Sequence, residues 1–200
     1  MFYDATRDDH GLPHDPMKAL VGPRPIGWIS SQDANGIANL APYSFFNLVS
    51  TSPPIVAFSS GSRKDSQANI ETTGEFVCNI ASAELAAAVN ASAAPVEPGV
   101  DEFELAGLDK VASNLVSAPR VAIARAHLEC RYLKTVQLED LDGGAMNWGV
   151  IFGQVVGVHI DDSLLNEGIV DVSALNPLSR LGYLDYGVLG EVFAMARPGS

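Results

Sequence analysis

The chain has 200 residues, 47% of them hydrophobic and 18% charged, which is the composition of a globular protein with one substantial core. Its net charge of −12 argues against a nucleic-acid partner, since duplex binding needs Lys and Arg to neutralise phosphates, and against an anionic membrane surface. No run approaches the roughly 18 apolar residues of a membrane span, and the N-terminus lacks the basic and apolar segments of a secretory signal. With only Cys78 and Cys130, the chain has no disulfide framework, and we expect it in the cytoplasm.

In chain order, residues 1–17 are polar and predict an N-terminal arm, and β-like segments follow. A short apolar run ends at the hairpin pair Asn35-Gly36, and a second extended segment runs from Ile37 to about Val49. Pro53-Pro54 interrupts that segment, because proline cannot donate to a central ladder. Residues 55–58 then predict a short buried strand.

A helix follows this strand, with Asp65 or Ser66 able to cap its start and Gly74 placed to end it. The later pattern predicts a strand at 75–80, an alanine-rich helix at 83–94, and two long extended segments at 121–136 and 148–160 around an acidic turn at 139–144. Several strands with only short helices predict a mainly β fold (α+β) that is a closed or nearly closed barrel. No Gly-x-Gly-x-x-Gly follows a strand, so we do not expect a Rossmann domain.

The loop between the strand at 55–58 and the next helix has the chemistry of a phosphate site. It places hydroxyls, a glycine and two cations, Arg63 and Lys64, at the start of a helix, where unpaired backbone N–H groups favour an anion. A solvent-exposed turn whose serines only cap the helix explains the same spacing equally well.

The segment 39–47 offers what the edge and faces of a flat heteroaromatic ligand need. Asn39 and Ser44 bring polar atoms, Pro42 frees neighbouring backbone groups, and apolar side chains lie between them. Pattern reasoning alone favours an ordinary edge strand with proline at a bulge.

Together these segments resemble the flavin reductase-like family, whose fold is an FMN-binding split β-barrel of Greek-key type. The resemblance extends from about Lys18 to Pro198. The blocks that carry it are Arg24-Pro25-Ile26-Gly27-Trp28-Ile29-Ser30-Ser31, Asn39-Leu40-Ala41-Pro42-Tyr43-Ser44-Phe45-Phe46, Pro53-Pro54-Ile55-Val56-Ala57-Phe58-Ser59, Lys64-Asp65-Ser66-Gln67-Ala68-Asn69-Ile70, Thr73-Gly74-Glu75-Phe76-Val77-Cys78-Asn79-Ile80, 101–108, Pro119-Arg120 and 178–183.

The resemblance implies a single FMN-binding domain over residues 1–200, with 1–17 as an arm, that works as a homodimer with FMN near the subunit interface. By similarity, Asn39, Ala41 and Ser44 would lie along the isoalloxazine and ribityl chain. Ser59, Ser60, Lys64 and Ser66 would lie near the phosphate. The remaining cofactor-binding candidates are Ser30, Ser31, Pro42, Tyr43, Ser62 and Arg63. Many relatives have Thr where Ser66 stands and Gly where Tyr183 stands, and the second change places a bulky ring on the substrate side.

In this family the flavin carries the hydride chemistry, so we name no catalytic residue. The resemblance implies an NAD(P)H-dependent flavin reductase that passes electrons from NADH or NADPH through FMN to a flavin, another small-molecule acceptor or a partner protein. One alternative is a non-enzymatic, flavoredoxin-like electron-transfer protein, and another is a barrel that has lost its flavin. The acidic segment 95–104 would cover either the flavin or the dimer interface.

Other residues that carry chemistry have simpler explanations. Cys78 and Cys130 lie in apolar strands and are expected to be structural thiols. The four histidines lack ligand spacing, so we expect no metal site. Trp28 and Trp148 could wall a flavin pocket, although core packing explains each equally well.

Overall fold

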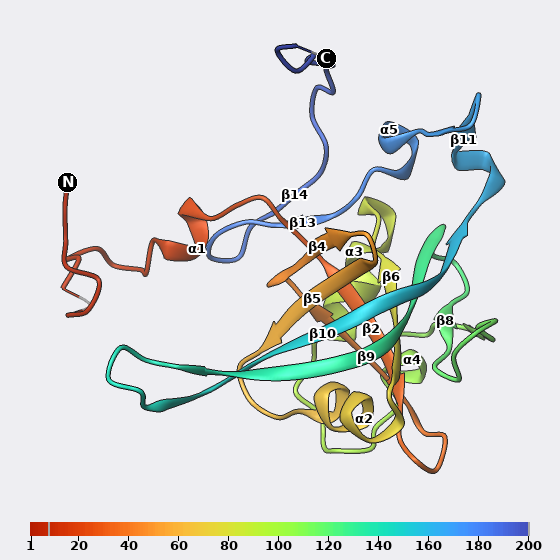
Figure 1. Cartoon of the computed structure of the whole chain (residues 1–200), viewed down its shortest axis with the longest axis horizontal. Helices are drawn as coiled ribbons and strands as arrows, with labels where there is room; N and C mark the ends of the chain where they lie inside the picture. Colours follow the sequence, from red (N-terminus) through yellow and green to blue (C-terminus); the bar gives the residue numbers. More distant parts are fainter. Residues whose placement is uncertain (8, 200) are drawn as a thin grey trace.

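Seven antiparallel strands form the main sheet of the protein (Figure 1). The structure is a computed structural model that describes residues 1–7 and 9–199. In spatial order the strands are β3 (Ala38–Tyr43), β2 (Gly27–Gln32), β6 (Glu75–Ile80), β9 (Ala126–Glu139), β10 (Ala145–Ile160), β5 (Pro54–Ser60) and β4 (Phe46–Thr51).

The sheet curls into a barrel that is split between its two edge strands. β3 and β4 stand at opposite ends of the hydrogen-bonded order, yet only Ser44 and Phe45 separate them in the chain. Two residues cannot span an open sheet of this width, so the edges must approach each other. The mainly β barrel predicted from the sequence is confirmed. A continuous strand from Ile37 to Val49 is wrong, because the chain changes from one edge to the other at Ser44.

Alternating side chains bury both faces of the strands near the split. On β2, Trp28 and Ile29 point to opposite faces, and both are fully buried. Ile29 packs inside the barrel with Phe58, Phe76 and Ile151, among others. Trp28 belongs to an outer core that includes Leu40, Phe103, Val121 and Leu178. β2 is therefore covered on both faces, and it holds the edge strand β3 in place through their pairing.

Helix α2 (Asp65–Thr73) ends where the sequence predicts, with Gly74 at φ +77° as its C-cap. The predicted capping by Asp65 or Ser66 is wrong, because Lys64 is the N-cap and no side chain caps this end of the helix. The predicted helix over 83–94 is shorter and consists of a 3₁₀ turn, η1 (Ala83–Leu85), followed by α3 (Ala86–Ala91). α4 (Glu102–Leu105) is capped by Asp101, whose side chain accepts a hydrogen bond from the Phe103 amide at 2.9 Å.

Short elements complete the chain, and some of them pair its N-terminal part with its C-terminal part. They are α1 (Met17–Leu20), β1 (Arg24–Pro25), β7 (Lys110–Val111), β8 (Arg120–Val121), η2 (Asp162–Leu164), β11 (Leu165–Asn166), β12 (Ile169–Val170), α5 (Val172–Leu175), β13 (Ser179–Arg180) and β14 (Tyr186–Gly187). β13 pairs with β1 on one side and β14 on the other, so the C-terminal part returns to the start of the barrel.

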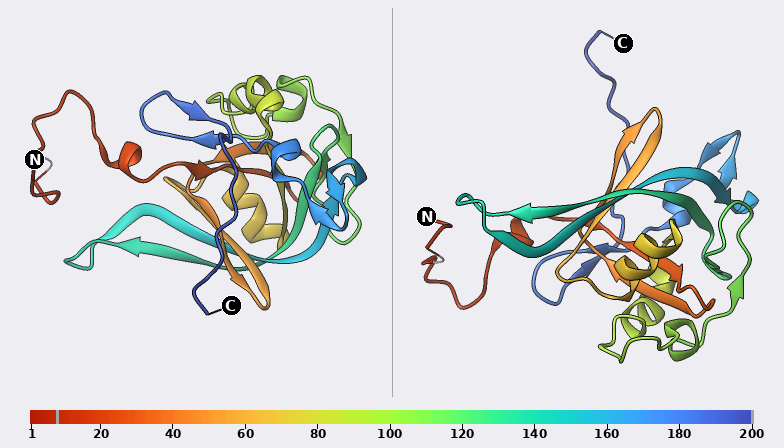
Figure 2. Two further views of the ribbon diagram at one scale, coloured as in Figure 1. Left: turned by 90° about the horizontal axis from the view of Figure 1, so that it is seen from above. Right: turned by 60° about the horizontal axis from the view of Figure 1, so that its bottom comes forward.

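Three segments extend beyond the barrel (Figure 2). The N-terminal arm and the tip of the β9–β10 hairpin project from the same side of the body, and the C-terminal tail leaves it separately. The hairpin turn lies at 140–144, where the sequence predicts an acidic turn. Within residues 1–7 and 9–199, no helix has both the length and the apolar character to cross a membrane.

Candidate functional site

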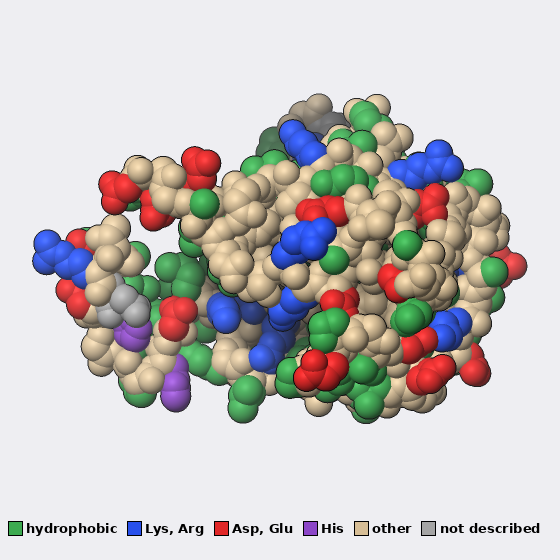
Figure 3. All heavy atoms as spheres, turned by 90° about the horizontal axis from the view of Figure 1, so that it is seen from below, with side chains coloured by type: hydrophobic (Ala, Val, Ile, Leu, Met, Phe, Trp, Pro, Cys, Tyr) green, Lys and Arg blue, Asp and Glu red, His purple; other side chains and the backbone are tan. Residues whose placement is uncertain are grey.

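Two neighbouring clefts open at the split of the barrel. The main cleft, of about 420 Å³, is lined by Asn39, Ala41, Pro42, Tyr43, Arg63, Lys64, Asp65, Ser66, Ser92, Ala93, Ala94, Pro95, Val96, Pro98 and Glu102. The basic cleft, of about 260 Å³, is lined by Lys18, Arg24, Pro42, Tyr43, Ser44, Phe45, Ser59, Ser60, Gly61, Lys64, Trp148, Arg180, Leu181 and Tyr183. The clefts share Pro42, Tyr43 and Lys64, so a ligand in one is adjacent to a ligand in the other. Figure 3 shows Lys and Arg side chains gathered at a hollow where the N-terminal arm joins the body.

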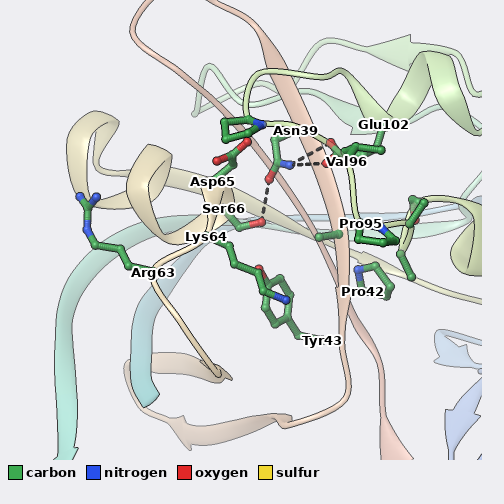
Figure 4. Close-up of a pocket in the computed structure, with 15 residues that line it drawn as sticks. Asn39, Pro42, Tyr43, Arg63, Lys64, Asp65, Ser66, Pro95, Val96 and Glu102 are labelled. Atoms are coloured by element: carbon green, nitrogen blue, oxygen red, sulfur yellow. Dashed lines mark hydrogen bonds between the residues drawn. The ribbon is translucent and has the colours of Figure 1, made fainter. Parts of the chain in front are cut away.

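The walls of the main cleft come from segments distant in the sequence (Figure 4). The end of β3 supplies Pro42 and Tyr43, and the chain between α3 and α4 supplies Pro95 and Val96. The acidic segment 95–104 therefore covers this cleft. Gly99 N donates to the Asp65 carboxylate at 3.0 Å, which ties the segment to the start of α2.

A buried hydrogen-bond network lies beneath the main cleft. The two carboxylate oxygens of Glu102 accept hydrogen bonds from Asn39 Nδ2 at 2.9 and 2.8 Å, and Leu40 N donates to the same carboxylate at 2.9 Å. Ser66 Oγ in turn donates to Asn39 Oδ1 at 2.6 Å (Figure 4). The amide of Asn39 is thus engaged on both sides, and it joins α4, β3 and the first turn of α2 into one unit.

Burial raises the pKa of the Glu102 carboxyl, since its side chain is taken out of water. Hydrogen bonds from Leu40 N and Asn39 act in the opposite direction and partly offset the effect of burial on this pKa. These three hydrogen bonds, from the two donors Asn39 Nδ2 and Leu40 N, favour the carboxylate form, because the proton of a protonated carboxyl would oppose one of them.

The two cations of the phosphate-like loop have different surroundings. Arg63 points away from the other labelled residues of the main cleft, and its Nε donates to Glu71 at 2.9 Å (Figure 4). Lys64 runs beside Tyr43 and lines both clefts. Its ammonium has no hydrogen-bond or ion-pair partner in the described part of the chain. Lys64 is therefore the cation of this loop that is free to meet an anion.

The basic cleft is built by two arginines that hold backbone carbonyls. Arg24 donates to the carbonyls of Lys18, Val21 and Leu181, and Arg180 donates to those of Tyr183 and Asp185. These contacts fix the end of α1 and the loop before β14 without neutralising either guanidinium.

Aromatic rings form the opposite wall of the basic cleft. Phe45 lies 5.6 Å from Trp148, centroid to centroid, and the guanidinium of Arg24 lies 5.7 Å from the Phe45 ring. Gly61 permits this packing, because a Cβ there would lie 2.8 Å from Trp148 Cζ2. Tyr183 sits at φ +53°, a conformation that suits glycine, and its exposed ring faces the cleft rim.

Most of the cofactor-binding residues predicted from the sequence lie at these clefts. The main cleft contains Asn39, Ala41, Pro42, Tyr43, Arg63, Lys64 and Ser66, and the basic cleft contains Ser44, Ser59 and Ser60. Ser62 lines neither cleft, although its carbonyl accepts from Ser60 Oγ at 2.7 Å.

Ser30 and Ser31 are not brought to the clefts. Both are fully buried, and Ser30 is bonded to the Pro119 carbonyl and to Asn79. Ser31 contacts Asn39 and Asn69 at 3.4 Å. The burial of β2 explains this, because neighbouring residues enclose the side chains of both Ser30 and Ser31. We therefore leave them out of the proposed site.

Sequence reasoning anticipated one wall of the site only in part and missed another part of the site. Segment 95–104 is predicted to cover either the flavin or the dimer interface, whereas residues 92–94, which line the same wall, carry no recognisable motif. Lys18, Arg24 and Arg180 come from the two ends of the chain, and only the pairing of β1 with β13 unites them. A count of the scarce basic residues would have drawn attention to them but not to their proximity.

Comparison with known proteins agrees with this geometry. The sequence model described as "Flavin reductase like domain" matches residues 21–183. An uncharacterized protein of Halalkalibacterium halodurans is 36% identical over 189 residues, covering 90% of each chain. The crystal structure of nitrilotriacetate monooxygenase component B from Bacillus cereus superposes with a TM-score of 0.89 at 31% identity and covers 98% of both chains.

A second solved structure, the 2-nitrobenzoate 2-nitroreductase of Pseudomonas fluorescens, has the same fold, with a TM-score of 0.87 at 24% identity over 100% of this chain and 97% of that one. Other structural neighbours share the split barrel, and some are named for FMN binding. Family and neighbours together support a flavin-related oxidoreductase and FMN as its cofactor. The chain belongs to the flavin reductase-like domain family.

Proposed function

We propose that the protein is an FMN-dependent oxidoreductase that takes electrons from NADH or NADPH and passes them through FMN to a flavin or another acceptor. The observation that carries the proposal is the unpaired Lys64 at the start of α2, beside a cleft of about 420 Å³. An ammonium and the free N–H groups of a helix start suit a phosphate monoester. The size of the cleft lies within the usual range for a cofactor site, roughly 300–1,000 Å³.

Each part of the main cleft has a role toward FMN in this proposal. Lys64 and the backbone N–H groups of the first turn of α2, including that of Ser66, hold the phosphate, since the Ser66 hydroxyl already donates to Asn39. Pro42, Tyr43 and Val96 offer apolar surface to the ring system and keep water from it. The hydrogen bonds of Glu102 and Asn39 hold α4, β3 and α2 in fixed positions, so the site is ordered before the cofactor binds.

The bound flavin would supply the capacity to accept a hydride, and this chain supplies position and electrostatics. The 31% identity to a protein named as a monooxygenase component supports an oxidoreductase. The matched family description supports reduction of a flavin. We propose a single FMN-binding domain over residues 1–200, with 1–17 as an arm, working in the cytoplasm.

We also propose a homodimer, which exposed apolar side chains support. Phe2 and Leu20 of the N-terminal part, Leu141 of the hairpin turn, and Phe193 and Met195 of the C-terminal tail are all exposed. These segments project from the barrel instead of folding onto it (Figures 1 and 2). A second copy would cover this surface, because a monomer seldom leaves several apolar segments in water.

The experiment is an absorbance spectrum of purified protein after FMN is added and free flavin is removed, followed by anaerobic NADH and then NADPH. We expect flavin absorbance to remain with the protein and to bleach with one of the two nucleotides. Retained flavin that neither nucleotide bleaches would move the protein to the electron-carrier class. Loss of all flavin on desalting would contradict a resident cofactor.

A further inference from the structure

The basic cleft has a charge opposite to that of the molecule. Four of the chain's twelve basic residues line it, namely Lys18, Arg24, Lys64 and Arg180, in a protein of net charge −12. No Asp or Glu is among the described residues that line this cleft. The main cleft, in contrast, contains both Asp65 and Glu102.

The positive charges of this cleft are not neutralised by the protein. Arg24 and Arg180 bond to carbonyl oxygens, which leave a full positive charge in place. Arg24 Nε is buried and has no hydrogen-bond partner in the described part of the chain. Lys18 forms no ion pair or side-chain hydrogen bond with the described residues, so its ammonium is available to a ligand.

The shape and lining of the cleft limit what this ligand is. Phe45, Trp148 and Tyr183 supply ring surfaces, which suit a flat aromatic molecule. The volume of about 260 Å³ is below the roughly 300–1,000 Å³ of sites for drug-sized ligands. One or two rings fit this space, whereas a nicotinamide dinucleotide is too large to be enclosed.

We infer that the basic cleft binds the electron acceptor, and that this acceptor is a small aromatic molecule with an anionic substituent, held by Lys18. This inference rests on the proposed function, because the cleft adjoins the proposed FMN site through Pro42, Tyr43 and Lys64. A naphthoquinone carrying an anionic substituent is an acceptor of this kind. In the corresponding step, reduced FMN would supply two electrons and two protons to the quinone, which would become a hydroquinone.

The test compares a charged and a neutral acceptor of the same ring system, 1,4-naphthoquinone-2-sulfonate and 1,4-naphthoquinone. FMN-loaded protein is reduced with dithionite, so the result does not depend on any nicotinamide reaction. Second-order rate constants for reoxidation are measured by stopped flow for the unmodified protein, Lys18→Gln and the control Lys134→Gln. Lys18 lies on the exposed helix α1. Lys134 lies on β9 and lines neither cleft. Both variants are therefore expected to fold.

We expect Lys18→Gln to lower the rate constant for the sulfonate about tenfold, as loss of one charge-assisted contact predicts. The neutral quinone should change less than twofold, and Lys134→Gln should alter neither. Equal loss for both acceptors, or no loss for either, would overturn the inference. So would weaker FMN binding in Lys18→Gln, which would assign the cleft to the cofactor. Flavin reduction by NADH or NADPH is measured separately for the same variants, and a defect of Lys18→Gln confined to that step would assign the cleft to the electron donor and also reject the inference.

Discussion

At the scale of single residues, the cofactor assignment depends most directly on Lys64. The guanidinium of its neighbour Arg63 is held by Glu71, so the loop offers one free cation, the Lys64 ammonium, and not two. Lys64→Ala should weaken FMN binding by about 1–3 kcal/mol, because it removes a charge-assisted contact to the phosphate. Titration calorimetry with FMN measures the effect.

Riboflavin provides the control for Lys64, since it has the same ring system without the phosphate. The substitution should leave riboflavin affinity unchanged, and Lys134→Ala should leave both affinities unchanged. Equal weakening of FMN and riboflavin would show that Lys64 contacts the ring or shapes the cleft, and not the phosphate.

Tyr183 shows how the backbone explains a departure from the family pattern. The family resemblance drawn from the sequence implies a glycine at this position. The structure places it at φ +53°, which glycine adopts without strain and which other residues adopt less often. The ring stands at the rim of the basic cleft, 5.7 Å from His14 of the N-terminal arm. The sequence identifies this position but contains no signal for its dihedral angle.

At the scale of elements, β10 depends on a glycine. A Cβ on Gly153 would lie 2.3 Å from Cζ of Phe76, a fully buried ring in the barrel core. Gly153→Ala should therefore lower the free energy of unfolding by about 1–3 kcal/mol, since the added methyl overpacks this core. Urea unfolding measures it.

Gly190→Ala is the matched control for Gly153. A Cβ on Gly190 meets no atom within 4 Å, and its φ lies outside the left-handed region. Its free energy of unfolding should change by less than about 0.5 kcal/mol. An equal effect of the two substitutions would mean that the contact with Phe76 does not limit stability.

The elements that sequence patterns predict well are those set by local chemistry. Gly74 predicts the end of α2 correctly, and β-branched and apolar runs predict β5 and β6. Local patterns do not predict the break at Ser44, because its cause is the closure of the sheet. They do not predict the clefts for the same reason, since residues 92–98 and 180–183 reach β3 only through tertiary packing.

At the scale of the whole molecule, the projecting arms predict a specific assembly. Sedimentation equilibrium of the FMN-loaded protein should give a mass near twice the 21.1 kDa of one chain. The physical reason is the apolar surface on the N-terminal arm, the β9–β10 hairpin and the C-terminal tail, which association would bury. A mass of one chain at micromolar concentration would contradict the homodimer.

The contrast between an acidic exterior and a cationic cleft also bears on how molecules arrive at the protein. The surrounding carboxylates repel long polyanions, which must bring many charges close to the surface at once, whereas a compact anion exposes its single charge only to the attracting hollow. Such a field raises encounter rates for the small anion and acts over a Debye length, about 8 Å at physiological salt. The charge distribution thus favours the approach of small anions to the barrel over that of long polyanions.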